Sequence, residues 1–286
     1  MRGMGVLILA GVADVCPPGG VLWTDGRCVP EGLVGAPATW VLDVAIPVFA
    51  AVMVAVMVRD AIRKRRLTWW LLLSVCSAMC WWLETFGDWG QHLSYSPEFR
   101  HYTLDWVGTA PHNPYWMPLM YAVYWVAHAW AILRLAQYIQ RHRPSLSLGK
   151  AIMVLTIPVT WVWNLAIEGY AAYMGWWTYE PPIGPFLDMG RGNWPLLWPM
   201  LLMFTWINLI AWMVGPPEDE NQLNRIERLF RLDRLLSSPD PTSGSWRFQL
   251  VRFLSWTAFF QVSFAACFLV PLMGVRAVTG WDTPYS

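Results

Sequence analysis

The sequence predicts an all-α protein, a polytopic bundle of transmembrane helices. Hydrophobic residues make up 56% of the 286 residues and charged residues 14%, against roughly 45–50% and 25% for an average soluble domain. The apolar residues also gather in blocks close to the roughly 20 residues that a helix needs to cross a bilayer. Finally, Lys and Arg concentrate in alternate connections between these blocks, as in polytopic membrane proteins.

Six apolar blocks are predicted to span the membrane: 39–58, 68–86, 114–136, 151–174, 195–215 and 254–276. A shorter apolar run, residues 3–13, lacks a signal-peptide cleavage pattern and is a candidate for a short seventh span. The chain then divides into an apolar segment and outer loop (1–38), the helix bundle (39–276) and an outer tail (277–286).

The basic connections predict the orientation of the bundle. Connections 59–67, 137–150 and 216–253 hold most of the Lys and Arg residues, so they are expected on the cytoplasmic side. The C-terminus would then lie outside, and a bacterial inner membrane fits this arrangement. Residues 221–236 have helical apolar spacing and predict an amphipathic helix on the membrane surface or under the bundle; a solvated link between spans is an equal alternative.

Composition excludes two other classes of protein. High hydrophobicity argues against disorder, and 20 Lys+Arg against 19 Asp+Glu give no basic surface for nucleic acid. Cys16 and Cys28 share the first outer loop, where an oxidising compartment would permit a disulfide. Cys76 and Cys80 lie in a span and are expected to pack as small apolar residues.

Acidic residues inside apolar blocks are the strongest functional signal. A charge in the bilayer is costly and marks a functional candidate. Glu84 and Asp88 are four residues apart, as are Asn164 and Glu168, so each pair is expected to project from one helix face. We predict Glu84, Asp88 and Glu168 as catalytic residues in a cavity open toward the outer side. The alternative for Glu84 and Asp88 is that they mark a helix end at the headgroups.

Other polar and aromatic residues are predicted to bind substrate. Indole faces hold apolar ligands and stabilise transient cations. The set is Asn164, Asp43, Trp81, Trp82, Trp106, Trp163, His128 and Asn208. Packing is the alternative for His128, and interhelical hydrogen bonding is the alternative for Asn208.

A metal site is the alternative to this acid–base site. Glu84, Asp88 and His92 follow i, i+4, i+8 spacing, and His101 and His112 come next along the chain. Carboxylate and imidazole ligands suit iron, manganese or copper. No second His-rich cluster lies on another block, so we expect neither a metal nor another cofactor.

Several of these motifs together resemble the AveC-like spirocyclase family, membrane proteins associated with spiroketal formation in avermectin-type polyketides. The resemblance spans roughly residues 40–275. It is carried by Glu84-Thr85-Phe86-Gly87-Asp88, Tyr102 to Trp106, Asn164-Leu165-Ala166-Ile167-Glu168, Gly175-Trp176-Trp177-Thr178-Tyr179-Glu180-Pro181 and Ile226-Glu227-Arg228-Leu229-Phe230. It implies a dihydroxy ketone that loses water to form a spiroketal, and it adds Tyr179 to the substrate-binding residues.

The function expected from these features is a membrane-embedded cyclase in polyketide biosynthesis that acts on a bulky apolar molecule. Adjacent carboxylates in an apolar site cannot all ionise, so one keeps its proton. Glu168 is assigned as the acid, and Glu84 with Asp88 as base and orienting group. A terpenoid or carotenoid cyclase, a hydratase and a lipid isomerase would use the same groups. A non-catalytic membrane subunit or transporter is the alternative outside enzymes. The expected partners are a hydrophobic small molecule and the lipid bilayer.

Overall fold

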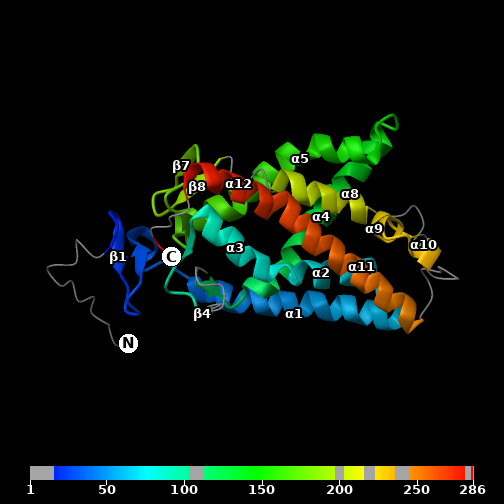
Figure 1. The fold of residues 1–286 in the computed structure, drawn as a ribbon, viewed down its shortest axis with the longest axis horizontal. Coiled ribbons are helices and arrows are strands. Elements are labelled where there is room, and N and C mark those ends of the chain that lie inside the picture. The colour runs from blue at the N-terminus through cyan, green and yellow to red at the C-terminus, as the bar shows by residue number, and fades with distance from the viewer. Residues whose placement is uncertain are drawn as a thin grey trace.

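A computed structural model of the chain describes residues 16–102, 112–196, 203–215, 223–235, 245–280 and 285. Within them the protein is mostly helical, as the sequence predicts. Short strands and the C-terminus gather at one end of an elongated bundle, and the short helices α9 and α10 lie at the other (Figure 1). The predicted short span at residues 3–13 lies outside the described residues.

Three helical segments are long and apolar enough to cross a membrane. They are α1 (Thr39–Lys64), α4 (Met117–His142) and the run Trp246–Thr279. That last run consists of α11 (Trp246–Phe264), a π-helical turn η6 (Ala265–Leu269) and α12 (Val270–Thr279). These segments match the predicted blocks 39–58, 114–136 and 254–276.

Two further segments qualify only as bent pairs. Helices α2 (Trp69–Ala78) and α3 (Trp81–Gln91) meet at 50°. The second pair bends by 43° next to Pro158, in α5 (Leu148–Asn164). Pro158 has no N–H to donate to the helical ladder, which explains the bend. This second pair continues through a π-helical turn η4 (Leu165–Gly169) into α6 (Tyr170–Met174).

The described residues therefore contain three to five candidate spans, and the predicted count of six is not confirmed. The difference lies in the predicted block 195–215. Its first residue ends strand β8 (Asn193–Pro195), and residues 197–202 lie outside the described residues. The described helical part comprises a π turn η5 (Met203–Ile207) and α8 (Asn208–Val214). The apolar helix found there, Thr205–Val214, is shorter than a span.

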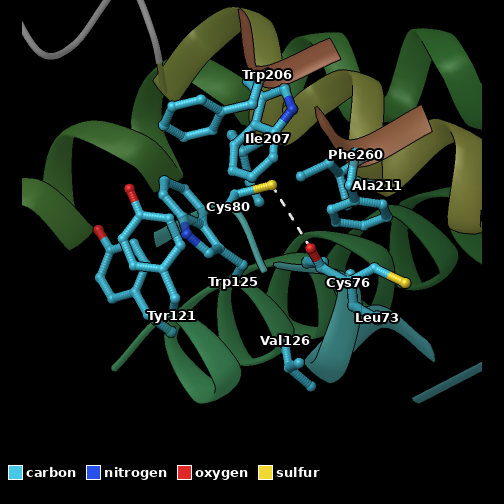
Figure 2. Packing of buried hydrophobic residues seen from close by; sticks show 14 of the residues in the cluster. Leu73, Cys76, Cys80, Tyr121, Trp125, Val126, Trp206, Ile207, Ala211 and Phe260 are labelled. Atoms are coloured by element: carbon cyan, nitrogen blue, oxygen red, sulfur yellow. Dashed lines mark hydrogen bonds between the residues drawn. The ribbon is translucent and has the colours of Figure 1, made fainter. Parts of the chain in front are cut away.

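Helix α4 is the centre of the core, in contact with α1, α2, α5 and α8. Its residues Ala129, Ile132 and Ala136 are fully buried. Figure 2 shows the packing of this core, in which Trp206 and Phe260 lie near residues of α2 and α4. Cys76 and Cys80 are buried here, and the Cys80 thiol donates to the Cys76 carbonyl oxygen at 3.5 Å, consistent with an apolar packing role.

Short antiparallel strand pairs close one end of the bundle. Strand β3 (Leu93–Tyr95) pairs with β6 (Trp177–Tyr179), with Tyr95 opposite Trp177. This pair ties the end of α3 to the end of α6, so it holds the two bent segments together. The other pairs are β1 (Gly20–Leu22) with β2 (Cys28–Pro30), β4 (His101–Tyr102) with β5 (Asn113–Pro114), and β7 (Phe186–Asp188) with β8. A disulfide joins Cys16 to Cys28, the pairing that the sequence allowed.

The predicted helix 221–236 lies at the end of the bundle opposite the strands, and its described part forms two short helices. Helices α9 (Arg225–Leu229) and α10 (Leu232–Leu235) are separated near Arg231, whose φ of 54° is left-handed. This conformation is costly for a residue with a Cβ, and it ends the helical run. Glu227 is fully buried and forms an ion pair with Arg252 of α11, so α9 packs under the bundle.

Candidate active site

A cavity of about 70 Å³ lies between α3, α4, η4 and the strand pair β3–β6. Two carboxyl side chains reach it from segments far apart in the chain, and most of the other lining residues are aromatic. The lining residues are Glu84, Leu93, Tyr95, Trp116, Met117, Met120, Tyr121, Tyr124, Trp125, Ile167, Glu168, Trp177 and Tyr179.

Glu84 comes from the first turn of α3, directly after the bend between α2 and α3. The Tyr121 hydroxyl of α4 donates a hydrogen bond to Glu84 Oε2. Tyr121 is itself buried, 4% exposed, so its phenol is held in place by the core. Glu84 keeps part of its surface open to the cavity.

Asp88 lies one turn further along α3 and is fully buried. Its carboxyl interacts with that of Glu84 and with the Asn113 side chain, although no donor within the described parts of the chain lies within 3.5 Å of either oxygen in hydrogen-bonding geometry. A group that only marked a helix end at the headgroups would meet water, so this burial argues against that alternative for Asp88.

Two glycines let α3 approach the last span closely. A Cβ on Gly87 would lie 2.2 Å from Phe268 Cε1, and a Cβ on Gly90 would lie 2.4 Å from Leu272 Cδ2. Small residues at such contacts allow membrane helices to pack tightly. The helix that carries Glu84 and Asp88 is therefore positioned by close contact with η6 and α12.

Glu168 lies in the π-helical turn η4. Its Oε2 accepts two hydrogen bonds, from Trp177 Nε1 at 2.7 Å and from the Tyr179 hydroxyl at 3.0 Å. Burial and then the nearby Glu168 carboxyl raise the pKa of Tyr179 well above its usual value, so the phenol keeps the proton it donates. Turns of this kind are frequent at functional sites, where they aim a side chain away from the regular helical row.

The same turn separates Glu168 from Asn164. Their i,i+4 spacing predicts one shared face, and the π turn adds an extra residue to the helix between them. Asn164 is buried, and its Nδ2 donates to the Thr160 carbonyl oxygen at 2.8 Å within its own helix. Asn164 is not among the residues that line the cavity, so its role in binding substrate stays a prediction.

The three acids nevertheless form one electrostatic group. Glu84 interacts with both Asp88 and Glu168, and Asp88 also interacts with Glu168. Glu84 and Glu168 face the cavity, whereas Asp88 lies behind Glu84. The sequence-based expectation that carboxyls from separate segments share one cavity therefore describes Glu84 and Glu168 directly.

Of the residues predicted to bind substrate, Tyr179 lines the cavity and contacts Glu168. Asp43 of α1 accepts a hydrogen bond from the Arg100 backbone instead. Trp81 packs edge-on against Tyr102, with ring centroids 5.7 Å apart.

The other predicted binding residues that the structure describes also lie outside the lining. Trp82 Nε1 donates to Gln261 Oε1 at 3.1 Å. His128 is fully buried and stacks on Trp163 with ring centroids 4.9 Å apart, as its packing alternative predicts. Asn208 is half-buried in α8, and Trp106 lies outside the described residues.

Most of the aromatic residues that line the cavity were not predicted from the sequence as binding residues. Tyr121, Tyr124 and Trp125 follow i, i+3, i+4 spacing on α4. Tyr95 of β3 and Trp116, directly before α4, complete the wall. Tyr121 and Tyr124 could have been noticed in the sequence, because they place two phenol groups in the middle of the apolar block 114–136, where a polar group needs a partner.

The row Glu84, Asp88, His92 does not form a metal site. His92 is the first residue after α3 and has a left-handed φ of 58°. Arg276 donates to its Nε2, so its Nδ1 carries the proton and donates to the Pro181 carbonyl oxygen at 2.8 Å. Across the described ranges, no group of three or more His, Cys, Asp or Glu residues could hold a metal ion.

The fold and the cavity together describe a helical protein with segments long and apolar enough to cross a membrane and with a buried, acid-lined aromatic site. No family model, curated protein or solved structure matches the chain. The function is therefore argued from the geometry of this site.

Proposed function

We propose that the chain is a membrane-embedded cyclase that performs acid–base catalysis with Glu84, Asp88 and Glu168. The observation that carries this proposal is that Glu84 and Glu168, from separate bent segments, line one aromatic cavity. Spiroketal formation from a dihydroxy ketone is the most specific form of the proposal, and it rests on the family resemblance described above.

The hydrogen bonds favour a definite starting distribution of protons. Two carboxyls in contact in an apolar environment do not both ionise. Asp88 is fully buried and its carboxyl lies beside that of Glu84, so in this proposal the Glu84–Asp88 pair carries one proton between them. Glu168 accepts two donors on one oxygen, an arrangement that suits a carboxylate. In the first step, Glu84 is then the acid and Glu168 the base.

The two steps of spiroketal formation exchange these roles. First, one substrate hydroxyl oxygen bonds to the ketone carbon, Glu168 takes the hydroxyl proton, and Glu84 gives a proton to the ketone oxygen. Second, Glu168 returns that proton to the hemiketal hydroxyl, which leaves as water. The second substrate hydroxyl then adds to the oxocarbenium carbon and gives its proton to Glu84. Both carboxyls return to their starting state, and Glu168 is the acid of the dehydrating step, the role assigned from the sequence.

The aromatic wall supports the charged intermediate. An oxocarbenium ion is a cation, and Trp and Tyr ring faces attract cations. Trp116, Trp125, Trp177 and Tyr124 all line the cavity. Holding the substrate folded also contributes, because cyclisation requires the two reacting ends to meet.

The volume of the cavity restricts how a substrate binds. About 70 Å³ is below the roughly 300–1,000 Å³ of pockets that hold drug-sized ligands. Only the reacting centre fits the cavity as it stands. A larger substrate requires movement of wall residues, and the flexible side chains of Met117 and Met120 are suited to that.

The same small volume favours one second candidate function, proton-coupled transport. Buried acids in membrane spans mark proton paths as well as active sites. A cavity that holds a few waters beside Glu84 and Glu168 is large enough for proton transfer. Terpenoid or carotenoid cyclisation, hydration and lipid isomerisation would use the carboxyls as the proposed enzyme does.

We also propose that the strand end and the C-terminus face the outside of a bacterial inner membrane. The Cys16–Cys28 disulfide lies at this end and needs an oxidising compartment. The basic connections after α1 and α4 lie at the opposite end, where the distribution of Lys and Arg predicts the cytoplasm.

The test is product formation by the purified protein in detergent at neutral pH. A symmetrical dihydroxy ketone serves as substrate, and mass spectrometry detects the product that has lost one water. Glu168→Gln and Glu84→Gln should each lower the rate by about 10²–10⁴-fold, the usual contribution of one acid–base group. Glu31→Gln, which changes an exposed acid at the same end, should leave the rate unchanged.

Equal rates in all four proteins would refute the acid–base role. Activity that appears only in vesicles with a proton gradient would favour transport instead. An isomerised product of unchanged mass would favour the isomerase alternative, because spiroketal formation must release water.

A further inference from the structure

A second and larger hollow lies on the outside of the bundle, away from the acids. Its volume is about 670 Å³, within the range of ligand pockets. It lies between the second half of α1, the middle of α4 and the start of α2. It is lined by Met53, Val56, Met57, Arg59, Asp60, Arg63, Trp70, Val126, Ala127, Trp130 and Arg134.

The lining changes from apolar to basic along the helix axis. Both α1 and α4 start at the strand end, so their residues follow the same order in space. The first part of the lining contains Met53, Val56 and Ala127, and the last part contains Arg63 and Arg134. Such a gradient matches a molecule with an apolar tail and a charged head.

The charges at the basic end favour an anionic head. Arg59, Arg63 and Arg134 are exposed there. The single acid in the lining, Asp60, pairs with Lys64 at 3.3 Å, which offsets its charge. Guanidinium groups match the oxygens of a phosphate with paired N–H donors.

The aromatic residues place this end at the headgroup level. Trp70 and Trp130 lie in the lining, and Arg134 lies over the Trp130 ring at 5.9 Å from its centroid. Trp is enriched where the hydrocarbon core meets the headgroups. Basic pockets between membrane helices bind anionic lipid headgroups.

We propose that this groove is a binding site for one anionic phospholipid. Its phosphate lies among Arg59, Arg63 and Arg134, and an acyl chain follows Met53, Val56 and Ala127. Such a lipid would cover more apolar surface on α1 than on α4, because only 11% of the apolar window of α1 is buried by protein, against 61% for α4. The lipid bridges these two helices, and it does so independently of the acid-lined cavity.

The test is native mass spectrometry of the purified full chain in detergent with added lipid. Dioleoyl phosphatidylglycerol and dioleoyl phosphatidylcholine have the same acyl chains but differ in head charge. Each basic residue near an anionic headgroup contributes roughly fivefold, so three contribute about a hundredfold. Phosphatidylglycerol should therefore bind far more tightly than phosphatidylcholine, and the triple variant Arg59→Gln/Arg63→Gln/Arg134→Gln should lose about a hundredfold of that affinity.

Two controls separate charge from groove shape. Arg141→Gln/Arg143→Gln/Lys150→Gln removes the same number of charges outside the groove and should keep the preference. Val56→Trp fills the apolar part without changing charge, and it should weaken binding of phosphatidylglycerol. Inorganic phosphate at the same concentration should not displace the lipid.

Three results would overturn the proposal. Equal binding of the two lipids by the unmodified protein, a comparison that needs no variant, is the first. Equal losses in the groove triple variant and the control triple variant are the second. Displacement by inorganic phosphate is the third, because it would show a plain anion site.

Discussion

Replacing Gly87 by alanine should push α3 away from the last span and disturb the acids it carries. The new Cβ would lie 2.2 Å from Phe268 Cε1 and 2.6 Å from Cζ. Carbon atoms in contact lie roughly 3.5–4.0 Å apart, so the helices must separate by about 1 Å. Phe268 is fully buried, which leaves its ring no free space.

The energetic cost follows from two opposing terms. Overpacking a filled interior costs about 1–3 kcal/mol. Gly→Ala in a helix gains up to about 1 kcal/mol from helix propensity alone. Gly274→Ala in α12 isolates that gain, because nothing lies within 4 Å of its added Cβ. Gly87→Ala should therefore be about 1–3 kcal/mol less stable than Gly274→Ala.

The assay is thermal unfolding in detergent followed by tryptophan fluorescence, together with product formation. A shift of α3 by about 1 Å moves Glu84 relative to Glu168 and should lower the rate by about 10²-fold. Gly274→Ala should retain the normal rate. Equal unfolding midpoints and equal rates for the two variants would refute the close contact on which the position of α3 depends.

Three further predictions concern groups outside the cavity. Burial lowers the pKa of His101 from 6.5 to about 4; the unfolded chain then takes up a proton between these values and the folded chain does not. The unfolding midpoint should therefore fall as the pH drops from 6.5 to about 4, and it should fall less in His101→Gln. Glu227→Gln leaves the buried Arg252 guanidinium without its carboxylate and should cost about 3–5 kcal/mol of unfolding free energy; a double variant that also carries Arg252→Met should recover part of this, and full additivity would contradict the coupling. In intact cells that produce the Cys16→Ser variant, Cys28 no longer has its disulfide partner, and a maleimide that does not cross membranes should label it. Labelling only after lysis would contradict the outward orientation of the strand end.

Much of the helical framework could be predicted because span length and hydropathy are local properties. Helices α1 and α4 and the run Trp246–Thr279 coincide with apolar blocks for this reason. Pro158 also signals the bend in α5, since it lacks an N–H. The bend after α2 and the left-handed Arg231 have no such marker. They depend on contacts between distant segments.

The candidate site could be predicted only in part. Glu84, Asp88 and Glu168 stand out because acidic residues are rare in apolar blocks. Their hydrogen-bond partners could not be assigned, because Tyr121 and Trp177 are equally at home in an aromatic belt.

The π turn at Glu168 could not be predicted from the sequence. Helical periodicity assumes 3.6 residues per turn, and the extra residue in Leu165–Gly169 breaks that assumption. Tertiary contacts such as the donors from β6 to Glu168 favour the turn, and a single sequence does not display them.

The most direct test of the central claim is chemical cross-linking between positions 84 and 168. Glu84→Cys and Glu168→Cys are combined in a variant whose Cys76, Cys80 and Cys267 are replaced, and the purified protein is treated with a short bifunctional thiol-reactive cross-linker. Peptide mass spectrometry should find a cross-link between the two positions, because both side chains face one small cavity. The pair Glu84→Cys/Val162→Cys should give none, since Val162 is 69% exposed on the outside of the bundle. Failure of the first pair to cross-link, or equal yield from the second, would contradict a shared acid-lined cavity.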